Sequence, residues 1–146
     1  QGGSVATGVD GAEPGCEALL DHRERPSWVP ARGSPPGLGR PPVVAIAGVQ
    51  GTLTVCYDLH FIDEIRPELL AADVLLFPSA WVERPDTRRD HLADVAREFG
   101  GHGANANWAP GIVRVPGQGN SCVVAPNGAI TTAAPLGRLD LDLGSL

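Results

Sequence analysis

The sequence of 146 residues contains no lysine and no methionine, and aromatic residues make up only 5% of it. Arginine therefore supplies every strongly cationic side chain of a chain whose formal net charge is −6. An acidic chain without a basic stripe lacks the electrostatic footprint of nucleic-acid-binding proteins, so no nucleic-acid partner is expected. No apolar run approaches the roughly 20 residues of a membrane span, so no span is expected. The absence of methionine predicts that Gln1 is not a translation start and that the chain is processed or excerpted.

Cysteine is also scarce. The three cysteines are an odd number, so at least one thiol lacks an intramolecular disulfide. Their spacing matches no zinc-binding pattern, and we expect neither a metal site nor a cofactor. This cysteine usage does not define a redox compartment, so cytoplasmic and secreted locations both stay open.

The length predicts one domain at most. The composition divides the chain into two segments. Residues 1–42 are rich in glycine and proline, with Trp28 as their single aromatic residue. Such a segment buries too little apolar surface to offset its chain entropy, so we expect a disordered or linker-like tail. Residues 43–146 contain the apolar and β-branched runs from which a folded unit can form.

The pattern after Val43 predicts strands separated by short helices. Val74–Phe77 is a continuous apolar run, typical of a strand that is buried on both faces. In Asp86–Phe99, apolar residues recur at helical spacing, with the arginines and aspartates largely on the opposite side. Gly100 and Gly101 are expected to end that helix. The other expected elements are a strand over 43–47, a hairpin turn at 48–51, strands over 52–56, 104–108, 121–125, 129–132 and 138–143, and a short helix over 66–72.

Cys56 ends the strand-like run 52–56, and a turn follows it. A rigid strand would carry its sulfur to the carboxyl edge of a sheet, where turns expose backbone N–H groups, which suits a thiol nucleophile. On spacing alone, a buried structural cysteine is equally consistent. Cys122, inside an apolar run, is predicted to be a core thiol.

Two sequence strings carry a family resemblance. Cys56-Tyr57-Asp58-Leu59-His60-Phe61, with Arg66 ten positions after the cysteine, precedes the run Ala72–Trp81. Together they resemble the nucleophile region of the nitrilase (carbon–nitrogen hydrolase) superfamily, in its C-terminal half. The likeness covers roughly residues 43–146 and departs from the family at three positions, with His60 for arginine, Ile62 for proline and Asp63 for glutamate. Further matching pieces are Asn105-x-Asn107, Gly119-x-Ser121, Ala125–Gly128 and Gly137–Leu139; Phe77–Trp81 and Ala125–Asn127 are most similar to the biotinidase/pantetheinase branch.

The resemblance implies a site and a reaction. Cys56 would attack an amide or nitrile carbon, and the backbone N–H of Tyr57 would help to bind the oxyanion. The pocket mouth would contain His60, Ser79, Ala80 and Trp81 as substrate-binding residues, and the ligand would be a small-molecule amide. His60 as an exposed turn residue and Trp81 as a cap on the core are the competing interpretations.

The same resemblance identifies what this chain does not contain. The family's general-base glutamate and oxyanion-binding lysine belong to its N-terminal half, and this chain has no lysine at all. Losing one oxyanion donor costs roughly 10²–10³ in rate, so we expect little activity from this chain alone. Arg32 and Arg40 are poor substitutes, because both lie in the linker-like tail.

Three interpretations follow for the chain as a whole. It is the C-terminal half of an amidase whose other half lies elsewhere, a catalytically dead relative kept for binding, or an unrelated α/β domain with a structural or redox thiol. The family fold is a four-layer α-β-β-α sandwich, of which this chain would form a part. One apolar sheet face would then lack its cover, so we expect association with a missing N-terminal half or a homo-oligomer.

Overall fold

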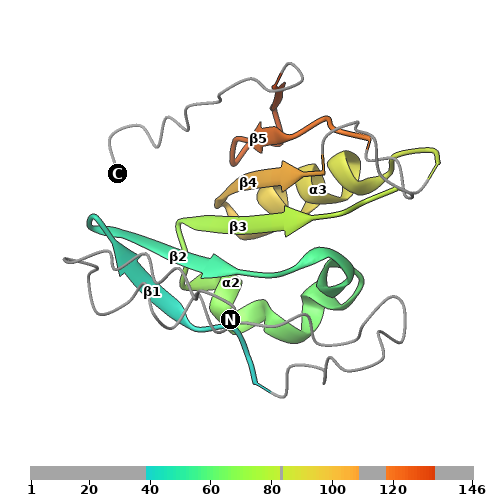
Figure 1. The fold of residues 1–146 in the computed structure, drawn as a ribbon. Helices are drawn as coiled ribbons and strands as arrows, with labels where there is room; N and C mark the ends of the chain where they lie inside the picture. The colour runs from blue at the N-terminus through green and yellow to red at the C-terminus, as the bar shows by residue number, and fades with distance from the viewer. Residues whose placement is uncertain (1–38, 83, 109–117, 134–146) are drawn as a thin grey trace, which may run out of the picture.

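The computed structural model describes residues 39–82, 84–108 and 118–133, which form one six-stranded sheet with the strands in chain order (Figure 1). The three central strands β2, β3 and β4 are parallel, and the outer neighbours pair antiparallel. The strands are β1 Val43–Ile46, β2 Val49–Leu53, β3 Val74–Ser79, β4 His102–Asn107, β5 Cys122–Val124 and β6 Ile130–Thr132. Each corresponds to a predicted strand, with ends shifted by a few residues. The strand predicted over 138–143 lies outside the described residues.

Two crossover connections carry the helices. The 3₁₀ helix η1, Cys56–Ile65, and the short helix α2, Arg66–Leu70, connect β2 to β3. Helix α3, Arg88–Phe99, connects β3 to β4, and Figure 1 shows it behind these two strands. Parallel neighbours need such crossovers, since a tight turn can connect only antiparallel strands. Among the described residues, no helix is both long and apolar enough to cross a membrane.

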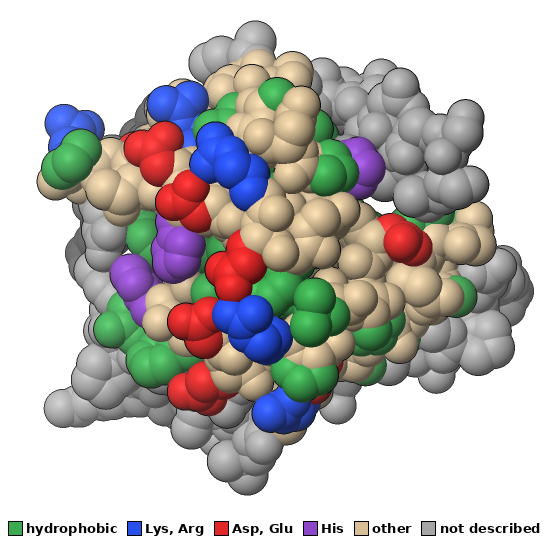
Figure 2. Space-filling model, turned by 180° about the vertical axis from the view of Figure 1, so that it is seen from behind, with side chains coloured by type: hydrophobic (Ala, Val, Ile, Leu, Met, Phe, Trp, Pro, Cys, Tyr) green, Lys and Arg blue, Asp and Glu red, His purple; other side chains and the backbone are tan. Residues whose placement is uncertain are grey.

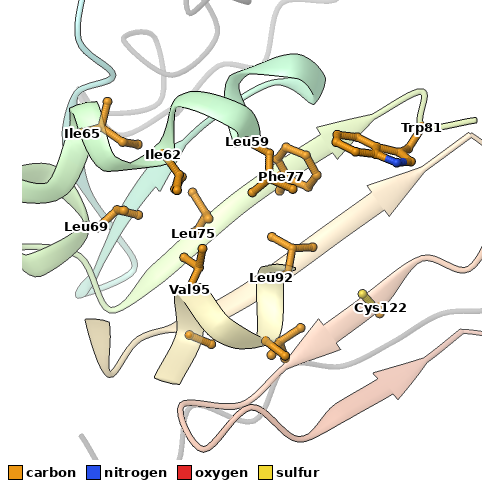
Figure 3. Packing of buried hydrophobic residues seen from close by; sticks show 13 residues of the cluster. Leu59, Ile62, Ile65, Leu69, Leu75, Phe77, Trp81, Leu92, Val95 and Cys122 are labelled. Atoms are coloured by element: carbon orange, nitrogen blue, oxygen red, sulfur yellow. The ribbon is translucent and has the colours of Figure 1, made fainter. Parts of the chain in front are cut away.

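The helices pack on a single face of the sheet. Leu75 and Phe77 of β3 and Cys122 of β5 point into the same core as Leu59 of η1 and Leu92 of α3 (Figure 3). Seen from behind, the helical side of the molecule carries charged side chains of both signs in a mixed pattern (Figure 2). The residues that alternate with the core positions form the opposite face, and most of them are only half-buried: Val44, Ile46, Leu53, Leu76, Ala104 and Val123.

The first hairpin differs from the prediction. The turn consists of Ala47 and Gly48 rather than residues 48–51, and Ile46 pairs directly with Val49. Both turn residues have positive φ, 51° and 85°, which gives the twist that a two-residue hairpin requires. The sequence placed the turn too far along the chain because Gly51 also resembles a turn residue, although Gly51 lies inside β2.

Helix α3 is confirmed in its extent and corrected in one side chain. It ends where predicted, at Gly100 in the left-handed conformation with φ 70°. It begins at Arg88, and the Arg88 side chain is fully buried instead of facing solvent with the other charged residues. The helical period places residue 88 on the same side as Leu92, four positions later, so the core stripe includes this arginine.

The residues just before β1 pack against the folded unit. Pro41 is fully buried, and the Thr52 hydroxyl donates to the Pro42 carbonyl at 3.1 Å. Arg40 forms an ion pair with Glu68 of α2 at 3.1 Å. Residues 39–42 therefore contact the sheet and α2, while the division of the chain at residue 42 stays a prediction.

Candidate functional site

The candidate site lies at the edge where the parallel strands end. Because β2, β3 and β4 run in one direction, their carboxyl ends meet at the same edge of the sheet (Figure 1). The turn at Cys56 follows β2, the Trp81 segment follows β3, and Asn107 is the last residue of β4. In open α/β sheets this edge is the usual place of a ligand site.

Cys56 occupies a strained strand-to-helix turn. Its φ is +44°, a left-handed conformation that costs a non-glycine residue on the order of 1–3 kcal/mol. The buried carboxylate of Asp58 holds this turn by accepting the Val55 N–H at 3.0 Å, and the Asp58 N–H donates to the Val55 carbonyl at 3.0 Å. A sharp turn of this kind is how hydrolase folds present a nucleophile above a sheet. Cys56 is half-buried, whereas Cys122 is only 1% exposed.

Aromatic rings extend from the Cys56 turn to the Trp81 segment. The Tyr57 and His60 ring centroids are 4.7 Å apart, and the His60 ring stacks on Trp81 at 5.2 Å. Phe61 meets Tyr57 edge-on at 5.8 Å, and Phe77 meets Trp81 at 6.5 Å. Three of the predicted site residues, Tyr57, His60 and Trp81, therefore form one continuous cluster beside Cys56.

The structure places Trp81 in the core, which is one of the two interpretations that the sequence left open, and its role in substrate binding stays a prediction. Its side chain is 5% exposed and belongs to the core (Figure 3). The exposed His60 ring stacks on the indole, with the ring centroids 5.2 Å apart. The indole Nε1–H is buried and has no hydrogen-bond partner in the described part of the chain. A buried donor without a partner is uncommon and often marks a place for a water or a ligand.

Two asparagines on β4 connect the strand ends. Asn107 is buried, and its amide contacts Ser79, Trp81 and Gly119. Asn105 donates from Nδ2 to the Phe77 carbonyl at 2.6 Å and to the Ser79 hydroxyl at 3.0 Å. The Ser79 hydroxyl therefore lies between two protein amides, while Ala80 beside it is exposed. The sequence contained the Asn-x-Asn string, but nothing in it indicated this network.

A buried ion pair lies at the start of α3. Arg88 donates from Nη2 to Asp86 at 3.0 Å and to the Asn120 carbonyl at 3.1 Å, and its Nε and Nη1 have no described partner. Burial lowers the pKa of the Arg88 guanidinium, although Asp86 opposes this shift. Burial also raises the pKa of the Cys122 thiol, which Arg88 partly offsets. Cys122 is therefore a neutral core thiol, as predicted.

The motif arginine lies away from these groups. Arg66 pairs with Glu98 of α3, and its guanidinium lies over the Phe99 ring at 5.1 Å from the centroid. It connects α2 to α3 on the helical side. Among the described residues, no group of histidine, cysteine and acidic side chains is arranged to hold a metal ion.

Comparison with known proteins identifies similar solved structures. A cysteine-to-alanine mutant of Nesterenkonia AN1 amidase, from the nitrilase superfamily, is 28% identical, with a TM-score of 0.67 over 80% of this chain and 45% of that one. An amidase from Nesterenkonia sp. is 29% identical, with a TM-score of 0.66 over 78% of this chain and 44% of that one. A glutamate-to-glutamine mutant, bearing the acetamide moiety of fluoroacetamide on its active-site cysteine, matches with the same identity, TM-score and coverage.

These matches confirm the fold class. The chain has a carbon–nitrogen hydrolase fold, represented in part by the mixed sheet with helices on one face. It spans less than half the length of the amidases that it matches. The sequence matches no protein-family model and no curated protein.

Proposed function

The chain belongs to the nitrilase superfamily, and from this premise we propose that it carries the nucleophile of an amidase that cleaves a small-molecule amide. The observation that carries the proposal is the strained turn at Cys56, at the carboxyl end of a central parallel strand. A similar solved structure carries an acetamide group on its active-site cysteine, and another is bound to butyramide. The first shows that the active-site thiol of such an amidase is nucleophilic, and the second, in a cysteine-to-alanine mutant, shows that its site holds a small aliphatic amide.

The proposed reaction has two steps. The Cys56 thiolate adds to the amide carbon, and the resulting oxyanion accepts a hydrogen bond from the Tyr57 backbone N–H. The C–N bond then breaks, the nitrogen takes a proton and leaves as the amine, and a thioester remains on Cys56. Water adds to the thioester carbon, the C–S bond breaks, and the acid leaves with the thiol restored.

The residues assigned to the pocket are also proposals, and their positions fit this reaction. His60 and Trp81 present stacked rings next to Tyr57, where the acyl part of a substrate would lie. Ser79 and Ala80 form the strand end that leads to Trp81, with the Ser79 hydroxyl engaged by Asn107. The likeness of Phe77–Trp81 to the biotinidase/pantetheinase branch stays a prediction about which amide is cleaved.

A second polypeptide segment is required for turnover. The oxyanion-binding lysine of the family has no counterpart in a sequence without lysine. The glutamates that precede Cys56, which are Glu13, Glu17 and Glu24, lie in the predicted tail without the family's surrounding motif. The sheet face opposite the helices offers half-buried apolar residues such as Ile46, Leu53 and Leu76. We infer that a segment supplying a glutamate, a lysine and an apolar sheet face covers this surface, as in a four-layer sandwich. Without such a segment, the chain would be a binding module with an idle thiol.

Reconstitution tests the proposal. This chain is co-expressed with the glutamate- and lysine-bearing half of a Nesterenkonia-type amidase, and amide hydrolysis is measured on butyramide. We expect turnover that Cys56→Ala abolishes and that Cys122→Ala leaves within about twofold, because Cys122 lies in the core away from the turn. Turnover that survives Cys56→Ala would refute the nucleophile assignment. Full turnover by this chain alone would refute the need for a second segment.

The sheet face opposite the helices has its own test. This chain alone should bind the dye ANS and sediment as a mixture of oligomers, because a half-buried apolar face promotes association. Leu76→Lys, placed at the middle of that face, should reduce both signals, while Leu70→Lys on the exposed side of α2 should not. A dye-free monomer of the unmodified chain would contradict the interpretation.

A further inference from the structure

We propose that Asn107 is a positioning residue, whose side-chain amide fixes the Trp81 segment against the Cys56 turn. The inference deepens the proposed function and rests on it only where Cys56 is taken as the reacting group. The starting observation is the buried side-chain amide of Asn107, which has no role in the proposed reaction. Asn107 ends β4, at the same edge of the sheet as Cys56, but it is separated from that turn by β3.

The Asn107 amide makes every hydrogen bond that its chemistry allows. Its Oδ1 accepts from the Ser79 hydroxyl at 2.9 Å and from the Trp81 N–H at 2.8 Å. Its Nδ2 donates to the Trp81 carbonyl at 3.3 Å and to the Gly119 carbonyl at 2.8 Å. An amide has two donor hydrogens and two acceptor lone pairs, so nothing is left over for a ligand. The residue therefore acts through the groups that it holds.

The contact with Trp81 is a two-point clamp. One amide binds both the N–H and the C=O of Trp81, as a neighbouring strand would, although β3 has already ended at Ser79. The Asn107 side chain thereby extends the hydrogen bonding of the sheet beyond the end of β3, to Trp81. It fixes the backbone of Trp81 and with it the direction from which the indole enters the site.

The clamp is itself held from two sides. Asn105 donates to the Ser79 hydroxyl, which in turn donates to Asn107. On the other side, the Asn107 N–H donates to the Ser121 hydroxyl at 3.0 Å, and the Gly119 N–H donates to the Trp108 carbonyl at 2.7 Å. Asn105 Oδ1 is buried with no partner among the described residues, so the network is fully satisfied at Asn107 and not at Asn105. A buried amide whose four hydrogen bonds are all made, as at Asn107, specifies a single arrangement of the groups that it holds.

A series of adjacent aromatic rings connects Trp81 to the Cys56 turn. The indole stacks on His60 at 5.2 Å with an interplanar angle of 27°, and His60 meets Tyr57 at 4.7 Å. Tyr57 follows Cys56 directly and carries the proposed oxyanion donor. A displacement of about 1 Å in such a chain is enough to cost roughly 100-fold in a positioned reaction. Asn107 thus sets the shape of the pocket wall without touching a substrate.

An aspartate at this position isolates the two donors. Asn107→Asp keeps the size of the side chain but replaces both Nδ2 hydrogens with lone pairs that face the Trp81 and Gly119 carbonyls. The clamp should therefore open on its carbonyl side. Asn127→Asp is the matched control, because Asn127 is exposed and uses only its Oδ1, which accepts the Ala129 N–H at 2.9 Å.

The first experiment reads the position of Trp81 and needs no catalysis. Trp28→Phe and Trp108→Phe leave Trp81 as the single tryptophan of the full chain, and its near-ultraviolet circular dichroism is recorded at one fixed pH of about 8. An indole held in one orientation against another ring gives a band there, whereas loss of fixed tertiary packing removes it. His60→Ala removes the stacked ring and should lower the Trp81 band by about twofold, and His91→Gln should leave the band unchanged.

Asn107→Asp should lower the Trp81 band by about twofold, and Asn127→Asp should leave it unchanged. Val124→Ala, a fully buried core truncation, provides a variant of lowered stability that should also keep the band. If Asn107→Asp does not fold, Ser79→Ala removes one partner of the amide and should give an intermediate loss. A band of full strength in both Asn107→Asp and Ser79→Ala would overturn the positioning role.

The second experiment uses the reconstituted amidase. Asn107→Asp should raise KM for butyramide by about tenfold and change kcat by less than about threefold, a loss of binding geometry rather than of the thiol. If the complex shows no turnover but the Trp81 band depends on Asn107, the proposed amidase function fails and the positioning role stands. If the complex turns over and Asn107→Asp changes neither KM nor the Trp81 band, the positioning role fails.

Discussion

The two ends of the helix-covered sheet face differ in what holds them together. At the amino end of β3 and β4, side chains such as Leu69, Leu92 and Phe99 line a small apolar cavity between α2, α3 and the sheet. At the carboxyl end, Asn107, Ser79 and Arg88 form hydrogen bonds across several segments. The amino end is stabilised by shape and volume, and the carboxyl end by polar groups with specific partners.

This difference separates stability from function within one core. Volume packing tolerates exchange among apolar residues of similar size, whereas a buried polar group has a cost when a single partner is lost. Strained or unsatisfied groups occur where function is located, and here the left-handed Cys56 and the unpaired Trp81 Nε1 both belong to the carboxyl end. The comparison predicts that a substitution that keeps the volume will be tolerated at the amino end and costly at the carboxyl end.

The largest effect is expected from a truncation at the amino end. Leu92→Ala removes a side chain that is 2% exposed and enlarges the existing cavity, so the free energy of unfolding should fall by about 3 kcal/mol. Leu92→Met keeps the volume and should cost less than about 1.5 kcal/mol. Urea unfolding at one fixed chain concentration measures both. Equal losses for the two variants would show that volume does not control this end.

At the carboxyl end, a change that keeps the volume should be costly. Asp86→Asn removes the charge that compensates the fully buried Arg88, and we expect a loss of about 2–3 kcal/mol in the free energy of unfolding. Asp94→Asn, at an exposed ion pair with Arg97, is the control and should cost less than about 0.5 kcal/mol. If Asp86→Asn were as harmless as its control, the polar description of this end would be wrong.

A smaller, opposite effect is expected where the cavity has room. Gly103 lies in β4 with ordinary φ, and a methyl group there would make van der Waals contact with Val124. Gly103→Ala should therefore stabilise the chain by about 0.5 kcal/mol, chiefly by restricting the unfolded chain. Gly128→Ala should destabilise it, because φ is +82° and the added methyl would overlap the Arg97 guanidinium. Thermal unfolding that ranks Gly128→Ala above Gly103→Ala would contradict this.

The smallest effect concerns acid. Burial lowers the pKa of His91, and the neighbouring His60 lowers it further. The unfolded chain then binds the proton more readily than the folded one, so His91 destabilises the fold as the pH falls below about 6.5, the ordinary histidine value. His91→Gln should flatten the loss of stability between about pH 6.5 and about pH 5 and leave stability at about pH 8 unchanged. Urea midpoints across this range measure the difference, and identical profiles would exclude the effect.

Local patterns in the sequence were sufficient for the elements and for the recognition of Cys56. The helical spacing of Leu92, Val95 and Phe99 and the stop at Gly100 predict α3, because both signals depend on neighbours within two turns. The Cys56–Phe61 and Ala72–Trp81 strings indicated the family, since the turn at Cys56 and the strand beside it are each short and continuous. The same strings named His60 and Trp81, which the fold places together.

Only the tertiary structure determined which strand ends lie together and which hydrogen bonds form between them. The burial of Arg88, the clamp of Asn107 on Trp81 and the positive φ of Cys56 all depend on groups distant in sequence or on the fixed path of the chain. The helical period aligns Arg88 with Leu92, but no local pattern supplies the partners that allow a charged side chain to be buried there. An asparagine at the end of a strand likewise has no local pattern that marks it as buried. Their environment arises only when β3, β4 and the 118–121 segment converge at one edge of the sheet. The elements follow from local periodicity, whereas the polar network of the candidate site follows from long-range pairing.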